Sequence, residues 1–196
     1  AGGPFASAVF QIDTILLSGE CSYLCWHQDF EDATEFGSWW RLANKGVPKW
    51  QRVASKGGAG NHAAMAKLTG PVGSGGGTTL IYPLGIYRWV LPVAGATVSF
   101  RTRVTTTGNL CPEPVMRMSL MYLKTSGVQP IPGVLLAGAS LLEVATECDD
   151  TKGWKTHNVA VGGEVRARKF LPNFKAETPK SGTVAVEVDD LSVRCM

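Results

Sequence analysis

Two pairs of adjacent acidic residues stand near opposite ends of the 196-residue chain. Glu31 and Asp32 follow an aromatic residue near the start, and Asp189 and Asp190 lie within a valine-rich segment near the end. Carboxylates leave water only when they are paired, hydrogen-bonded or bound to a metal, so four of them together would suit a hard cation held by oxygen ligands. The alternative is that Asp189 and Asp190 only close a strand, while Glu31 and Asp32 lie in a solvated turn.

The segment Thr183–Cys195 is expected to be the strand that positions the second acidic pair. Valine recurs at every second position from residue 184 to residue 188, which is the period of a half-buried strand. If the alternation continues, Asp190 falls on the valine face and Leu191 on the other. Either a β-bulge therefore lies near Asp189 and Asp190, or a carboxylate points inward.

Five cysteines are expected to form disulfides rather than a zinc site. They are Cys21, Cys25, Cys111, Cys148 and Cys195, and their separations do not repeat a zinc-binding pattern. A bridge between Cys25 and Cys195 would join the two segments that carry the acidic pairs. A second bridge would join Cys111 and Cys148, which leaves Cys21 unpaired. Sequence does not fix the connectivity, and five reduced, buried cysteines are the alternative.

Much of the chain is expected to form short strands between turns, because it holds 23 glycines and 11 prolines and lacks a long amphipathic helical pattern. The expected strands are residues 61–68, 78–82, 88–91, 97–104, 115–124, 134–147, 154–161, 165–171 and 183–195. Residues 134–147 also fit a helix, but the preceding Pro-Ile-Pro-Gly favours a strand. The sequence therefore predicts an all-β, antiparallel two-sheet β-sandwich.

The composition excludes several functional classes. Charged residues make up 18% of the chain and the net charge is +3, so the basic stripe of a nucleic-acid-binding protein is missing. The longest apolar runs are far shorter than the roughly 20 residues of a transmembrane helix. The three histidines lie near no nucleophile motif such as Gly-x-Ser-x-Gly. We therefore expect a protein that is not an enzyme and has no transmembrane segment.

The order of several short motifs resembles that of the MAM domain, an extracellular adhesion module of receptor phosphatases, meprins and neuropilins. The matching motifs are Cys25 with Phe30-Glu31-Asp32 and Trp39, Trp50-Gln51-Arg52, Gly60-Asn61-His62, Thr79-Leu80-Ile81-Tyr82-Pro83, Val98-Ser99-Phe100, Met121-Tyr122-Leu123-Lys124, Trp154 before Val159, and the segment Val186–Cys195. Members usually carry a second cysteine just before the tryptophan that Trp39 matches, where this chain has Gly37 and Ser38. The family's usual disulfide pairing therefore does not carry over.

The resemblance implies a jelly-roll sandwich over residues 25–196, with residues 1–24 as an N-terminal extension or arm. It also places the chain near a wider set of jelly rolls that resemble carbohydrate-binding modules. Related jelly rolls often hold a structural Ca²⁺, so the resemblance implies Glu31 and Asp190, together with Asp32 and Asp189, as its ligands. Oxygen ligation without sulfur favours Ca²⁺ over zinc.

The candidate binding residues are three tryptophans and three arginines. They are Trp39, Trp40, Trp50, Arg101, Arg103 and Arg117. Aromatic faces stack on sugars and anchor protein contacts, although one of the adjacent Trp39 and Trp40 is expected in the core. The arginines alternate with apolar residues on their strands and would form either a cationic patch or an ordinary solvated face.

These observations predict a recognition module that is secreted or exported to a lumenal compartment. The first hypothesis is an adhesion module that binds a protein partner. The alternatives are a structural accessory subunit of a large, membrane-associated complex and a carbohydrate-binding module that takes a glycan.

Overall fold

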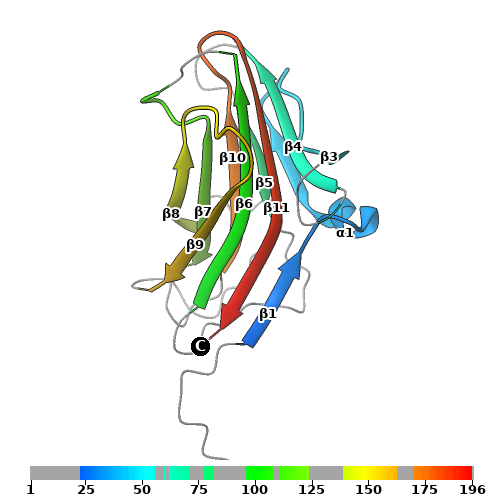
Figure 1. Cartoon of the computed structure of the whole chain (residues 1–196), viewed down its shortest axis with the longest axis vertical. Helices are drawn as coiled ribbons and strands as arrows, with labels where there is room; N and C mark the ends of the chain where they lie inside the picture. The colour runs from blue at the N-terminus through cyan, green and yellow to red at the C-terminus, as the bar shows by residue number, and fades with distance from the viewer. Residues whose placement is uncertain are drawn as a thin grey trace, which may run out of the picture.

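Two antiparallel sheets face each other in the computed structural model, which describes residues 23–55, 60, 62–70, 77–81, 96–107, 111–123, 139–162 and 170–195. Sheet A contains β1 (Tyr23–Gln28), β3 (Gln51–Ala54), β4 (His62–Thr69), β6 (Ala96–Thr106), β9 (Lys155–Val161) and β11 (Thr183–Cys195). Sheet B contains β2 (Trp40–Ala43), β5 (Gly77–Ile81), β7 (Met116–Leu123), β8 (Ala139–Glu147) and β10 (Phe170–Glu177). The predicted all-β two-sheet sandwich is confirmed, and Figure 1 shows its two layers.

Strand β11 organises sheet A, as its valine pattern predicts. It pairs with β4 along its first half, with β1 along its second half, and with β6 along most of its length. Its end lies beside the start of β1 (Figure 1). The pairing with β6 shifts register between Asp189 and Ser192, and Asp190 has a φ of 51°. Of the two alternatives that the sequence leaves open, the bulge is therefore the one that forms, and it returns Leu191 and Val193 to the core.

The core lies between the inward faces of the two sheets. Phe100 of β6 meets Phe174 of β10 edge to face, with ring centroids 5.4 Å apart, a favoured arrangement for aromatic pairs. The alternating valines of β11 pack beside them, together with methionines of β7. Side chains of both sheets thus interdigitate in one hydrophobic cluster, as expected for a sandwich.

The strand predictions succeed where the alternation is regular, and they miss β1, β2, β3 and most of β10. The segment that fits either a helix or a strand forms β8, a strand. The expected strand at 88–91 and most of the one at 165–171 lie outside the described residues. Strand β10, which occupies the middle of sheet B, is only touched by the predicted range. It contains Pro172, which argues against a central strand, but pairing with β5 begins only at Asn173.

One short helix, α1 (Ala33–Ser38), precedes sheet B in the chain. The hydrophobic pattern does not predict this helix, because six residues are too few to show a helical period. No helix within the described ranges is long and apolar enough to cross a membrane. The expected N-terminal arm lies almost entirely outside the described residues, since β1 begins at Tyr23.

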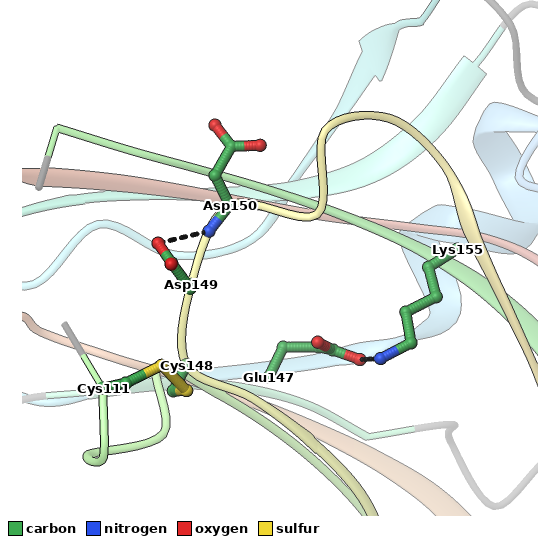
Figure 2. Close-up of a disulfide and its surroundings, with 6 residues drawn as sticks. All are labelled: Cys111, Glu147, Cys148, Asp149, Asp150 and Lys155. Carbon is green, nitrogen blue, oxygen red and sulfur yellow. Dashed lines mark hydrogen bonds and ion pairs between the residues drawn. A yellow bond between two sulfur atoms is a disulfide. The ribbon is translucent and has the colours of Figure 1, made fainter. Parts of the chain in front are cut away.

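A disulfide joins Cys111 to Cys148, the pairing expected from the sequence. It ties the segment before β7 to the residue after β8, and the Lys155 ammonium pairs with Glu147 beside it at 2.6 Å (Figure 2). Cys195 is also disulfide-bonded. The predicted Cys25–Cys195 pairing stays a prediction, because Cys21 and the Cys25 side chain lie outside the described part of the chain.

Candidate binding face

Two of the four predicted metal ligands have protein partners close to α1. The Asp32 carboxylate caps this helix by accepting the N–H groups of Thr34 at 2.6 Å and Glu35 at 3.3 Å, and these hydrogen bonds lower the pKa of Asp32. Glu31 accepts the backbone N–H of His62 at 2.8 Å, and its other oxygen lies 3.1 Å from the imidazole Nδ1 of the same residue. A local structural role therefore accounts for the first acidic pair.

The second acidic pair lies at the bulge of β11. Asp189 is fully buried and accepts the backbone N–H of Asp190 at 2.8 Å. Asp190 in turn lies 3.0 Å from the Nε2 atom of His27 on β1. Among the described residues, no group of three or more acidic, histidine or cysteine side chains is placed to hold a metal ion. The four carboxylates do not fit a shared ligand set as they stand, so no function is derived from a metal, and Ca²⁺ stays a prediction.

Two of the three candidate tryptophans belong to the core, which corrects their interpretation as binding residues. Trp50 is 0% exposed and Trp39 is 2% exposed. The indole N–H of Trp50 donates to the backbone carbonyl of Thr78 at 3.2 Å, and the Trp39 ring lies 5.3 Å from that of Phe30. Neither ring can stack on a ligand. The side chain of Trp40 lies outside the described residues.

The three candidate arginines do not form one cationic patch, because they lie on different sheets. Arg101 and Arg103 project from β6 on the outward face of sheet A, whereas Arg117 projects from β7 on the outward face of sheet B. The guanidinium carbons of the first two lie 5.4 Å and 5.0 Å from the ring centroid of Trp154. Such cation–π contacts hold both arginines against the sheet.

Arg103 also forms a two-point ion pair with a buried carboxylate. Its guanidinium donates through Nε and Nη2 to the two oxygens of Glu187, with the Nη2 contact at 2.7 Å. Ser55 hydrogen-bonds to both partners at 3.2 Å. The hydrogen bond to Glu187 raises the pKa of Arg103. This outward part of sheet A is a self-satisfied polar cluster, and its arginine charge is not free for an anionic ligand.

The outward face of sheet B carries a row of polar side chains that crosses β10, β7 and β8. Asn173 of β10 is paired in register with Ser119 of β7, and Ser119 is paired with Glu143 of β8. Residues opposite one another in a sheet project to the same side. Since Phe174 points into the core, the side chains of Asn173, Ser119 and Glu143 point outward. We call Asn173, Ser119 and Glu143 the outward row.

A charged network adjoins the outward row and shares Glu143 with it. Arg117 donates to Glu143 at 2.6 Å and to Glu177 at 2.8 Å, and Lys175 lies 3.2 Å from the same Glu177 oxygen. The two hydrogen bonds, with Glu143 contributing more than Glu177, raise the pKa of Arg117. Two positive and two negative side chains alternate, so this face offers both donors and acceptors without a net charge.

Asn173 is the unusual member of the outward row. Its side chain is 6% exposed, and its Oδ1 atom has no hydrogen-bond partner. Leaving a buried acceptor unsatisfied costs about 1–3 kcal/mol, so a bound molecule that displaces what covers this oxygen and donates to it would remove a penalty. Asn173 is not among the predicted site residues, because the preceding Pro172 argues against a central strand at this position. The alternation of Phe174 and Ala176 with Lys175 and Glu177 was the available sign.

No protein-family model matches the chain, and no curated protein matches it. Solved structures do. A structure of promiscuous carbohydrate-binding modules from the β-sandwich superfamily is 13% identical over 84% of this chain, with a TM-score of 0.57. The chain has the jelly-roll β-sandwich fold of these modules. The CBM22-1–GH10 modules of a Clostridium thermocellum endo-1,4-β-D-xylanase, complexed with xylohexaose, are 15% identical over 87% of the chain, with a TM-score of 0.56.

The jelly roll is also shared by an adhesin. The K3 cleaved adhesin domain of Lys-gingipain from Porphyromonas gingivalis is 17% identical, and the match covers 90% of this chain and 100% of that domain, with a TM-score of 0.51. By contrast, the chain spans only 60% and 28% of the two carbohydrate-binding structures above. At such low identity these likenesses establish the fold alone. The MAM family itself stays a resemblance in sequence.

Proposed function

We propose that this jelly roll is a non-catalytic glycan-binding module and that the outward face of sheet B is its binding face. The observation that carries the proposal is the buried Oδ1 atom of Asn173, which lacks a donor. Sugar hydroxyls are donors that an amide oxygen accepts readily. The shared fold of carbohydrate-binding modules supports the same ligand class.

The charge pattern of this face favours a neutral glycan. Arg117 and Lys175 are already paired with Glu143 and Glu177, so an anionic or cationic polymer would meet both signs in equal number. Hydroxyl groups can accept from the cations and donate to the carboxylates. Both glutamates act as acceptors in ion pairs with one arginine, which differs from the acid-and-nucleophile pair of a glycosidase.

The disulfide between Cys111 and Cys148 bears on where the module works. Disulfides form and persist in oxidising compartments. We therefore place the module outside the cell or in an exported, lumenal compartment, where polysaccharides and surface glycans are accessible.

A protein partner is the second candidate function. Leu141 and Leu142 of the edge strand β8 are 57% and 39% exposed, and exposed apolar side chains on a sheet edge favour protein contacts. The adhesin domain with the same fold is compatible with this function. If the chain is instead a subunit of a large complex, native purification would recover it with companions in fixed stoichiometry.

Calorimetry with neutral oligosaccharides tests the glycan proposal. The probes are β-1,4-linked xylohexaose, mannohexaose and cellohexaose, titrated into the wild-type chain and two variants. N173A removes the unsatisfied oxygen, and N158A makes the same change at an exposed position on the outward side of sheet A. We expect N173A to weaken binding about three- to tenfold, as for the loss of one neutral hydrogen bond, and N158A to leave it unchanged. Failure of the wild type to bind any hexaose would refute the proposal.

A further inference from the structure

A pocket of about 500 Å³ opens at the end of sheet B, beside the charged network. The segment that leads into β7, residues 111–115, forms one wall, and the segment that follows β10, residues 177–181, forms the other. The volume lies within the range of small-ligand sites, about 300–1,000 Å³. Arg117 and Glu177 line the pocket and also belong to the binding face, so the two are continuous.

The protein holds both walls of this pocket in place. The backbone N–H of Glu177 donates to Val115 at 2.9 Å, and the N–H of Val115 donates to Glu147 at 2.8 Å. The disulfide between Cys111 and Cys148 anchors the first wall to the end of β8 (Figure 2). Preformed walls reduce the ordering cost of binding.

The lining combines apolar surfaces with an unsatisfied hydroxyl. Three proline rings contribute apolar surface, namely Pro112, Pro114 and Pro179. The Oγ1 atom of Thr178 is buried and has no hydrogen-bond partner. A ligand with C–H faces and hydroxyl groups would match this combination, because the rings pack on C–H surface while the Thr178 hydroxyl, once its side chain rotates into the pocket, exchanges a hydrogen bond.

The charges of the lining cancel. Arg117 pairs with Glu177 at 2.8 Å, and Lys180 pairs with Glu113 at 2.5 Å. The second pair is solvent-exposed and joins the two walls, and such exposed pairs contribute little to stability, so it does not prevent a ligand from entering. An ionic ligand would find no uncompensated counter-charge, which favours a neutral one.

We infer that this pocket is a second subsite that takes a single neutral sugar ring at the end of a glycan whose inner rings lie on the outward face of sheet B. The inference rests on the proposed function. It extends that function from a face that binds internal sugar rings of a polysaccharide to a site that also recognises the terminal sugar. An oligosaccharide end would then contribute binding that an internal stretch of the same polymer lacks.

The test uses the full chain, methyl β-glycosides of xylose, mannose and glucose as single-ring probes, and the three hexaoses. T178V keeps the side-chain volume and removes the unsatisfied hydroxyl, so we expect its melting temperature to be unchanged or higher. T105V makes the same change at an exposed residue of sheet A and is the control. S181Y, at an exposed lining position, fills the pocket without touching the core.

For the methyl glycoside and the hexaose that bind the wild type most tightly, we expect T178V to lower the affinity about three- to tenfold. We expect S181Y to abolish methyl glycoside binding, and T105V to change nothing. Amide NMR signals of Glu177, Thr178, Lys180 and Ser181 should shift with the methyl glycoside, because the single ring would occupy the pocket.

The outcomes separate the two proposals. If N173A weakens the hexaose but neither T178V nor S181Y changes any affinity, the pocket subsite is wrong and the glycan-binding face stands. If a methyl glycoside binds in a Thr178-dependent way but no hexaose responds to N173A, the pocket stands and the face is wrong. If the wild type binds neither kind of probe, both proposals are overturned.

Discussion

Replacing Arg103 by methionine is expected to destabilise the fold, because it leaves the carboxylate of Glu187 buried without a cation. The Glu187 side chain is only 9% exposed, while Arg103 is 28% exposed. Breaking a fully buried ion pair costs about 3–5 kcal/mol, and an exposed pair is worth about 0–1 kcal/mol. For this partly buried pair, with the lost packing on Trp154 included, we expect R103M to cost about 2–3 kcal/mol. In a chain of this length that corresponds to a melting temperature lower by about 5–10 °C.

The size of this effect is best measured as a double-mutant cycle by urea denaturation at pH 7 with the disulfides intact. E187Q is expected to cost less than R103M, because Arg103 still reaches solvent, and the double variant R103M/E187Q is expected to be more stable than R103M alone. R194M, at an exposed arginine on β11, is the control and should stay within about 0.5 kcal/mol. The reasoning is refuted if R103M also falls within that margin, because Arg103 would then be free to serve a ligand.

Three further predictions concern the rest of the fold. Removing the disulfide by C111A/C148A, which opens a loop with a sequence separation of 37, should lower the free energy of unfolding by about 3–4 kcal/mol in urea titrations. Burial lowers the pKa of His157, so on acidification this side chain takes up a proton at a higher pH in the unfolded chain than in the folded one. The free energy of unfolding should therefore fall as the pH drops through about 6.5, and H157Q should remove that part of the pH dependence. If the four carboxylates bind Ca²⁺ as the MAM resemblance implies, millimolar Ca²⁺ should raise the melting temperature of EDTA-treated protein, and an unchanged value would count against the site.

The sequence revealed the elements whose side chains alternate without interruption. In β11 the valines mark the core face, and the mismatch between Asp190 and Leu191 leaves two alternatives, a bulge or an inward-pointing carboxylate. The register shift shows that the bulge is the one that forms. Most of β6 and β7 followed from the same rule. One face of each of these strands is buried, so apolar residues mark the core side and polar residues mark the outward side.

The sequence did not reveal the binding face, because its decisive residues look ordinary out of context. Asn173 follows a proline, and its importance comes from being buried beside β7 without a donor, which is a property of the packed sheet. Trp39 and Trp50, by contrast, look like binding residues in the sequence but are buried in the structure. A tryptophan that binds a ligand and a tryptophan that fills the core look the same in a sequence. Only the packed structure shows that Trp50 is buried and cannot contact a ligand. Asp32 and Glu35 did hold a sign of α1, since an acidic residue three positions before a glutamate is typical of a helix start.

The position of β11 has a consequence for how this jelly roll is made. It is the last of the described strands in chain order, yet β1, β4 and β6 all pair with it. During synthesis, β1 and β4 therefore cannot pair with β11 until residues 183–195 leave the ribosome. Contacts between residues this far apart in the sequence also make folding slow. Until then their unpaired edges are open to other chains. The nascent domain is expected to depend on chaperones until its last strand inserts.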